Sequence, residues 1–274
     1  MKTNSSLANS VAKPYRSFIS RCRCQGERKP PRKDRCICIH TDDPIEKPDL
    51  AIYSQVEQLN NGNVPNWDSP DIVTNFWKPF RLMDEAKVKV RNLSPTVPAI
   101  NALVHYSTSP FGIGTTQELK LTRVVNIPPG GEIELLFPLD QSTLQGDPRV
   151  GVHIQIEHPH DPNMINNEGA QVHDGGFTTE SGRNFTVQIP VYNDSNFSRE
   201  IQLSVMPTDI ITSLNPASKV FAAHEQIIAT LNIQIPNFLH GTPAAYISRA
   251  VTVVGRLTSG ELVGGVTRLI RIDD

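Results

Sequence analysis

The sequence predicts an all-β protein, made of two consecutive antiparallel β-sandwiches behind an N-terminal arm that carries the cysteines. Short runs of alternating apolar and polar residues recur from residue 49 to the C-terminal end, and this period of two is typical of half-buried strands. The 22 prolines and 17 glycines suit many turns between short strands. No segment keeps a convincing 3.6-residue apolar period over three helical turns.

The length of 274 residues is enough for one large domain or two of ordinary size. Pro44 and Pro48 favour an extended linker ahead of the first strand, and the Asp-Gly-Gly at 174–176 marks a second boundary. The predicted organisation is a flexible leader at 1–20, a basic Cys-x-Cys hairpin arm with its linker at 21–44, and sandwiches at 45–173 and 174–274.

Strands of the first sandwich follow from the alternation. "AKVKVRNL" places its alanine and valines on one face and its basic residues on the other. In "RVGVHIQIE" the valines and isoleucines at 150–156 face one way, so we expect His153 and Glu157 to face solvent. "DLAIYSQV", "INALVHYS", "LKLTRVVNI" and "EIELLFPL" are further candidates, and the Pro-Pro-Gly-Gly at 128–131 forms a turn before the last.

The second sandwich is predicted from "NFTVQIPVYN", "REIQLSVMP", "QIIATLNIQIP", "YISRAVTVVGRL" and "ELVGGVTRLIRI". "SKVFAAHEQIIATL" is the best helical candidate, but the β-branched residues in its second half favour strand. The closing segment indicates a hairpin whose last strand forms an apolar edge able to pair with another chain.

Charge is spread unevenly along the chain. Between Lys13 and Arg35 nine basic residues stand against two acidic ones, a balance of +7. With Lys2 the first 35 residues carry +8, so the rest must carry −10 to reach the net charge of −2. A basic arm on an acidic body indicates an interaction tail, which we expect to dock on a protein partner or on another copy of the chain.

All four cysteines lie in the arm as two Cys-x-Cys pairs. If the pairs form a hairpin, all four sulfurs share one face, because residues i and i+2 of a strand point the same way. Four thiolates suit a structural zinc ion, with an iron–sulfur cluster, two disulfides or free thiols as alternatives. The predicted metal ligands are Cys22, Cys24, Cys36 and Cys38.

Basic residues around these cysteines are the predicted partner-binding set. This pattern does not favour nucleic-acid binding, because stacking aromatic residues are scarce nearby. Charges that simply solvate an exposed loop are an alternative. The set comprises Arg21, Arg23, Arg28, Lys29, Arg32, Lys33 and Arg35.

Two other polar clusters are candidates for metal chemistry. The loop holding His158, His160 and Asp161 has suitable ligand types, although a polar loop after a strand explains it as well. Asp68 and Asp71 offer oxygen ligands of the kind that calcium uses, or they form turns around nearby prolines. The sequence shows no nucleophile elbow, phosphate-binding loop, dinucleotide fingerprint or zinc-protease motif, so we expect no catalytic residues and no enzyme.

Several phrases of the first sandwich occur together in one known family. "KPDLAIYSQ", "NVPNWDSPDIV", "AKVKVRNLSPTVPAINALVHYS", "VVNIPPGGEIELLFPL" and "MINNEGAQV" resemble the CARDB-type (cell-adhesion-related) bacterial Ig-like domains over about residues 47–172. The second half resembles Ig or fibronectin-III modules in general. The resemblance implies an Ig-like fold, a role in surface adhesion or in spacing attached domains, and an extracellular location.

The N-terminus lacks the apolar core of a secretory signal, and no apolar run is long enough to cross a bilayer. On that basis we expect a cytoplasmic protein or leaderless export, in tension with the family resemblance. The sequence thus predicts a non-enzymatic structural or binding protein. The alternatives are an accessory carbohydrate- or polymer-binding module of a secreted hydrolase system and a metal-dependent enzyme.

Overall fold

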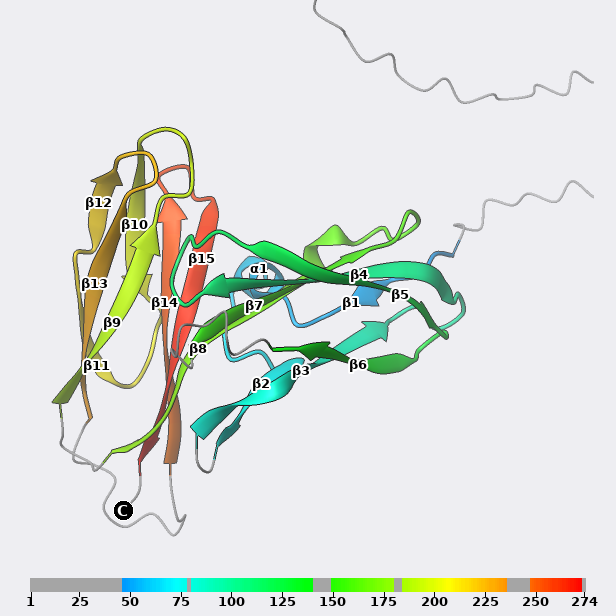
Figure 1. Ribbon diagram of the computed structural model, residues 1–274, viewed down its shortest axis with the longest axis horizontal. Helices are drawn as coiled ribbons and strands as arrows, with labels where there is room; N and C mark the ends of the chain where they lie inside the picture. The colour runs from blue at the N-terminus through cyan, green and yellow to red at the C-terminus, as the bar shows by residue number, and fades with distance from the viewer. Residues whose placement is uncertain (1–45, 78–79, 140–148, 180–183, 236–246, 273–274) are drawn as a thin grey trace, which may run out of the picture. The chain divides into compact units, whose positions relative to one another are not determined.

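The computed structural model describes residues 46–77, 80–139, 149–179, 184–235 and 247–272. The described residues are mostly strand with very little helix, and the strands form mainly antiparallel sheets packed in layers (Figure 1). The all-β sandwich prediction is therefore confirmed. The leader and the cysteine arm lie outside the described residues. In the described part of the chain, no helix has the length and apolarity needed to span a membrane.

The first sandwich packs two sheets around one core. In one sheet β3 pairs with β1 and β2 on one side and with β6 on the other, whereas the second sheet has the order β8-β7-β4-β5. The strands are β1 (Leu50–Ala51), β2 (Ile72–Trp77), β3 (Phe80–Asn92), β4 (Ala99–Pro110), β5 (Glu118–Ile127), β6 (Glu132–Pro138), β7 (Val150–Glu157) and β8 (Glu168–Thr179). Ala86, Val88 and Val90 of β3 face the apolar residues of β7 across this core, as their alternation predicts.

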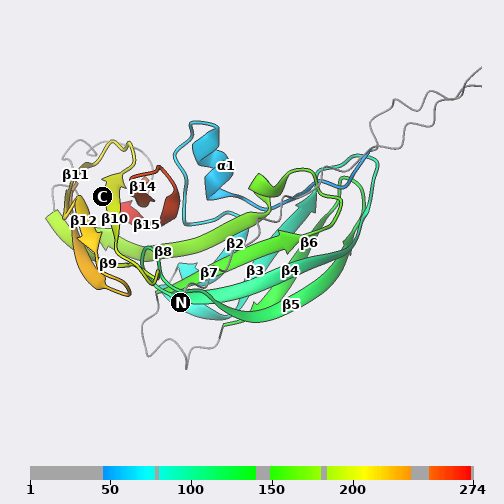
Figure 2. The ribbon, with the colours of Figure 1, turned by 90° about the horizontal axis from the view of Figure 1, so that it is seen from above.

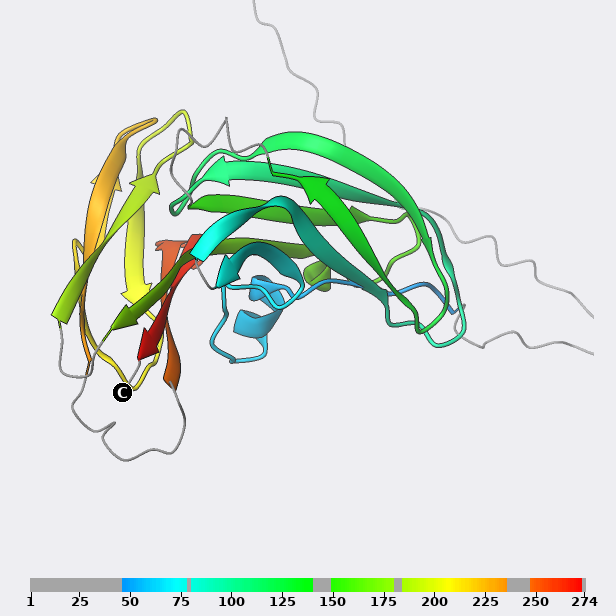
Figure 3. The ribbon, with the colours of Figure 1, turned by 60° about the horizontal axis from the view of Figure 1, so that its bottom comes forward.

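In the second sandwich, a three-stranded sheet packs against four strands of a larger sheet. Figure 3 shows the smaller sheet, of order β11-β13-β9, lying opposite the orange strand β14 and the red strand β15. The strands are β9 (Asn184–Tyr192), β10 (Arg199–Val205), β11 (Ile211–Asn215), β12 (Ser218–Phe221), β13 (Gln226–Gln234), β14 (Ile247–Leu257) and β15 (Leu262–Ile272). The segment considered as a helix, 218–231, forms β12 and much of β13, so the strand prediction is confirmed there.

A single eight-stranded sheet runs through both sandwiches in the order β12-β10-β14-β15-β8-β7-β4-β5. The first half of β8 pairs antiparallel with β7, and its second half pairs parallel with β15, from His173 opposite Thr267 to Thr179 opposite Ile272. The Asp-Gly-Gly at 174–176 therefore lies inside a continuous strand. The expectation of an exposed last strand is wrong, because β15 is central in this sheet and has a partner on both sides.

One short helix departs from the expected strand pattern. Within "DLAIYSQV" the strand β1 stops at Ala51, and helix α1 (Gln55–Asn60) follows. Ser54 starts this helix, because its hydroxyl accepts a hydrogen bond from the Glu57 backbone N–H at 3.3 Å. A 3₁₀ turn, η2, covers Met164–Asn166. Figure 2 shows α1 beside β8, and residue contacts between the two confirm that placement.

Candidate functional site at the junction of the two sandwiches

The first half of β8 has an edge that β15 does not reach, and a side chain completes it. Gln55 accepts a hydrogen bond from the Ala170 N–H at 3.0 Å and donates to the Ala170 carbonyl oxygen at 2.7 Å. Gln55 also donates to the Asn66 carbonyl oxygen at 2.9 Å. Gly169 permits the backbone just before the helix to approach β8, since a Cβ at Gly169 would lie 2.6 Å from the Tyr53 carbonyl oxygen. The amide of Gln55 therefore acts as a short extra strand against β8.

Trp67 connects the two sandwiches through the same edge. The Val172 N–H donates to the Trp67 carbonyl oxygen at 2.7 Å, and the Trp67 N–H donates to Thr267 Oγ1 at 2.8 Å. The indole is 3% exposed and belongs to the core of the second sandwich. The ring can approach β15 this closely because position 265 is glycine, where a Cβ would be 2.5 Å from ring atoms.

A loop after β4 makes another crossing. Ile113 is fully buried in the core of the second sandwich and extends β9 through two backbone hydrogen bonds of 2.9 Å, one to the Pro190 oxygen and one from the Tyr192 N–H. Its neighbours Gly112 and Gly114 have φ angles of +147° and +70°, a region that favours glycine. Side chains there would also collide with the β9 backbone.

A buried ion pair reinforces the pairing of β8 with β15. Arg268 lies opposite Asp174 in the register of these strands, and Arg268 Nη1 is 2.6 Å from Asp174 Oδ1, with side chains 6% and 15% exposed. Burial lowers the pKa of the Arg268 guanidinium, and the Asp174 charge counteracts that effect. Asp174 therefore stabilises the pairing of β8 with β15 through this ion pair, whereas the sequence had placed it at a boundary between domains.

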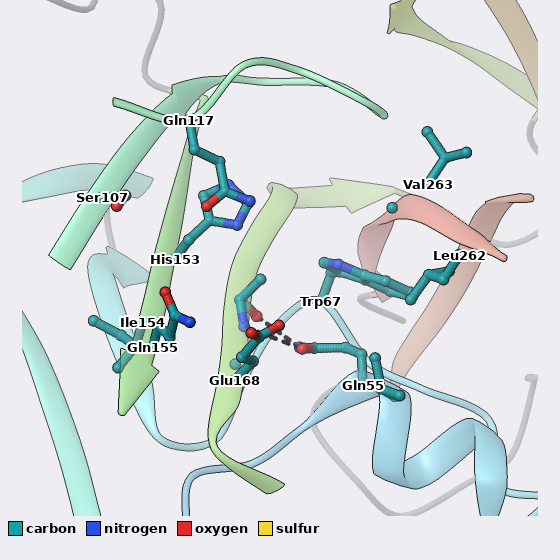
Figure 4. A pocket seen from close by; sticks show the side chains of 14 residues that line it. Gln55, Trp67, Ser107, Gln117, His153, Ile154, Gln155, Glu168, Leu262 and Val263 are labelled. Atoms are coloured by element: carbon teal, nitrogen blue, oxygen red, sulfur yellow. Dashed lines mark hydrogen bonds between the residues drawn. The ribbon is translucent and has the colours of Figure 1, made fainter. Parts of the chain in front are cut away.

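These connections frame a cleft of about 390 Å³ between the sandwiches (Figure 4). One wall is polar and rises from the outer face of the first sandwich, and the other is apolar and comes from α1, β15 and the edge of the Trp67 indole. We call it the junction cleft. Its described lining residues are Gln55, Val56, Trp67, Ser107, Gln117, His153, Ile154, Gln155, Glu168, Gly169, Ala170, Leu262, Val263 and Gly264.

His153 on β7 is part of the polar wall. Its Nε2 lies 2.9 Å from Ser109 Oγ, which is also 3.2 Å from the Pro110 carbonyl oxygen. The expectation that His153 faces open solvent is wrong, because the junction half-buries it. This burial lowers the pKa of His153 to about 4, so its imidazole is neutral at neutral pH.

The predicted arm sites lie outside the described residues. This holds for the four cysteines and for all seven basic residues assigned to partner binding, so both assignments remain predictions. Within the described part of the chain, no cluster of three or more His, Cys, Asp or Glu side chains has the arrangement of a metal site.

The histidine loop after β7 has a structural arrangement. Asp161 Oδ2 accepts hydrogen bonds from the Leu50 N–H at 2.9 Å and from Asn167 Nδ2 at 3.2 Å. His158 Nε2 lies 3.2 Å from the Ile100 carbonyl oxygen, and the His158 and His160 rings meet edge to face at 5.8 Å. The Asp161 carboxylate therefore ties β1 to this loop.

The two aspartates considered for calcium are also engaged. Both carboxylate oxygens of Asp71 accept hydrogen bonds from the Arg91 guanidinium, at 2.5 and 2.6 Å, and the Tyr53 N–H donates to one of them at 2.7 Å. Asp68 accepts a hydrogen bond from Gln171 at 3.1 Å. These contacts favour the structural alternative for both residues.

Sequence reasoning missed the junction cleft and Trp67. The adjacent glycines at 264–265 inside an apolar strand were a usable signal, because glycine in a strand often marks a close approach by another group. Nothing in the local pattern, however, names Trp67 as that group.

Comparison with known proteins yields no family model and no curated protein that matches. Among solved structures, Escherichia coli alpha-2-macroglobulin activated by porcine elastase is 10% identical, with a TM-score of 0.29 over 84% of this chain and 22% of that one. The Vibrio cholerae VesB protease is 9% identical (TM-score 0.25; 68% of each chain). The CupB6 tip adhesin from Pseudomonas aeruginosa is 8% identical (TM-score 0.17; 69% and 90%).

This chain thus spans about a fifth of the macroglobulin it is similar to. The similar structures include both an adhesin and a protease, and at these TM-scores they carry no argument about function.

Proposed function

We propose that this chain is a non-enzymatic structural and binding protein. Its two Ig-like sandwiches act as one rigid adhesion, spacer or assembly component, and its basic cysteine arm docks on a protein partner. The observation that carries the first part is the sheet that runs unbroken through β8 into both sandwiches. The arm's part of the proposal comes from its charge and cysteine pattern.

Rigidity follows from the number and kind of connections at the junction. Domains within one chain usually move relative to one another unless their interface is large and apolar. Here a hinge motion would have to break the β8–β15 ladder, withdraw Trp67 and withdraw Ile113 from the second core. Residues 45–274 accordingly form one compact unit. A component of this kind transmits position and force between its ends, as a spacer must.

The contacts of the carboxylates support the non-enzymatic assignment. A general acid or base needs a side chain that reaches a substrate, whereas Asp71 is held by Arg91 and Asp161 is held by backbone and amide groups. The hydrogen bonds of the Asp71 and Asp161 carboxylates stabilise the fold.

Spin labels at the two edges of the eight-stranded sheet test the rigidity. Val124 on β5 and Val220 on β12 are 62% and 64% exposed, and each is replaced by cysteine in a full chain whose native cysteines are serine. We expect one narrow distance distribution from double electron–electron resonance. The Trp67→Ala variant should broaden it.

The matched control places both labels in the first sandwich, at Val73 and Val124. Val73 is 43% exposed and lies on β2 of the opposing sheet, so this distance does not cross the junction. It should stay narrow in both backgrounds. A broad or two-peaked distribution between Val124 and Val220 in the unaltered junction would contradict the proposal.

The docking of the arm is tested in the full chain by replacing its seven basic residues with glutamine. We expect complexes in cell extracts, measured by size-exclusion chromatography with light scattering, to shrink to the size of the free chain. Deletion of residues 1–44 should have the same effect, because both apolar cores lie in later residues. Complexes of unchanged size in both variants would refute docking through the arm.

A further inference from the structure

Four polar side chains form adjacent rows on the polar wall of the junction cleft. Ser107 on β4 lies directly opposite His153 on β7, and Gln155 on β7 lies directly opposite Glu168 on β8. Directly opposed residues have Cβ atoms about 4.5–5.5 Å apart, and the two rows are two residues apart along β7. All four side chains point into the cleft (Figure 4).

Most of this wall is free to bind a ligand. Ser107, Gln155, Glu168 and the nearby Gln117 have no side-chain hydrogen bond or ion pair to another protein group among the residues that the structure describes. The hydroxyl, the two amides and the carboxylate together supply several donors and acceptors. Gln55 is different, because its amide is fully committed to Ala170 and Asn66.

The charge of the lining selects against anions. No lysine or arginine is among the described residues of the cleft, and anionic ligands such as phosphate are usually bound by those side chains. Burial keeps His153 neutral at neutral pH. Glu168 is the single carboxylate of the described lining and is exposed, so it can accept hydrogen bonds from hydroxyl groups.

The opposite wall is apolar and fixed. Leu262 and Val263 of β15 are half-buried and face the cleft together with Val56 of α1 and the edge of the Trp67 indole. A ligand that fits both walls has one face with hydroxyl or amide groups and another face made of C–H groups. The volume of about 390 Å³ lies at the small end of the range of about 300–1,000 Å³ for ligand sites.

We propose that the junction cleft is a binding site for a neutral saccharide unit. Its hydroxyl groups bond to Ser107, Gln155 and Glu168, and its C–H face packs on Leu262 and Val263. The contacts on β15 come from one sandwich and those on β4, β7 and β8 from the other. This inference goes beyond the rigid-component proposal and does not depend on it.

Nuclear magnetic resonance titration of the ¹⁵N-labelled full chain tests this inference. The probes are glucose, galactose, N-acetylglucosamine and their β-linked disaccharides, each raised to about 10 mM, enough to detect a millimolar Kd. We expect saturable shifts of the Gln117 and Gln155 side-chain amides and of the His153 ring with at least one probe. Glucuronate and inorganic phosphate should give none.

Two variants locate the site. Ser107→Ala and Gln155→Ala should each weaken binding roughly five- to tenfold, the usual loss for one neutral hydrogen bond. The matched control is Gln202→Ala, an exposed glutamine on β10 of the second sandwich, which should leave the affinity unchanged. Far-ultraviolet circular dichroism checks that each variant is folded.

Three outcomes would overturn the proposal: no saturable shift with any neutral probe, stronger binding of glucuronate or phosphate, or unchanged affinity in Gln155→Ala. Spin-label distances report on rigidity whether or not a saccharide binds. Failure of one proposal is therefore distinguishable from failure of the other.

Discussion

The half-buried imidazole of His153 makes the protein less stable in mild acid. The pKa of His153 is about 4 in the folded protein, against an ordinary value of 6.5, because burial disfavours the charged ring. Between these two values the unfolded chain binds a proton that the folded chain does not. Stability therefore falls as the pH drops from 6.5 to about 4, and the penalty is nearly absent at pH 7.

The size of this effect follows from the distance between the two pKa values. About 2.5 pH units separate them, and each unit is worth about 1.4 kcal/mol, so the penalty at pH 4 is about 3 kcal/mol. A loss of that size is a large fraction of the net stability of a typical domain, about 5–15 kcal/mol. The carboxylates titrate in the same range, so the contribution of His153 has to be isolated by comparison with a variant.

Urea unfolding at pH 7, 6, 5 and 4 measures this contribution in the wild type and in His153→Gln. Tryptophan fluorescence is a suitable signal, since Trp67 is 3% exposed and becomes hydrated on unfolding. The stability advantage of the wild type over His153→Gln should shrink by about 3 kcal/mol from pH 7 to pH 4. Carboxylate effects largely cancel in this difference.

The control is Gln202→Ala, an exposed residue of β10 that does not titrate, whose difference from wild type should stay constant from pH 7 to pH 4. If the difference between wild type and His153→Gln is flat from pH 7 to pH 4, the imidazole is not held neutral by the fold, and the reasoning is refuted.

Three further predictions concern the junction, the first sandwich and the arm. Gly265→Ala should cost about 1–3 kcal/mol in urea unfolding through overpacking against the Trp67 ring. The same change should cost less in a Trp67→Leu background, where the ring is gone; additive costs of the two changes would argue against this contact. Arg91→Met should cost about 2–3 kcal/mol, because it leaves the Asp71 carboxylate, whose side chain is 2% exposed, without its cationic partner. The double variant Arg91→Met/Asp71→Asn should cost less, and an equal cost would count against the ion pair. Elemental analysis with a thiol count should find one zinc per full chain and none after the four cysteines are changed to serine; two disulfides or four free thiols would refute the zinc site.

The sequence correctly predicts which side chains of a strand point to the core wherever only one face of that strand is buried. The valines and isoleucines at 150–156 and the alanine and valines of β3 alternate because one face of each strand meets a core. The same rule assigned His153 to the outer face correctly. Its half-burial was not predictable, because its partner Ser109 lies on another strand, 44 residues away in the sequence.

The sequence pattern predicted neither helix α1 nor the central position of β15 in its sheet. Six helical residues are too few to show a 3.6-residue period, and this helix starts where the Ser54 hydroxyl accepts a capping hydrogen bond from the Glu57 N–H. Apolar residues on both faces of β15 are consistent with a central strand, but strand order in a sheet depends on partners that local alternation does not name.

The sequence by itself determined that this chain builds β-sandwiches and which residues of the clearest strands enter a core, because period-two burial is a local property. Only the tertiary structure decided that β8 belongs to both sandwiches, that Trp67 reaches Thr267 across 200 residues of sequence, and that a cleft with one polar and one apolar wall lies between them. Those features depend on contacts between segments that are far apart in the sequence. Close packing and hydrogen bonds stabilise these contacts, and the local sequence pattern of either segment does not reveal them.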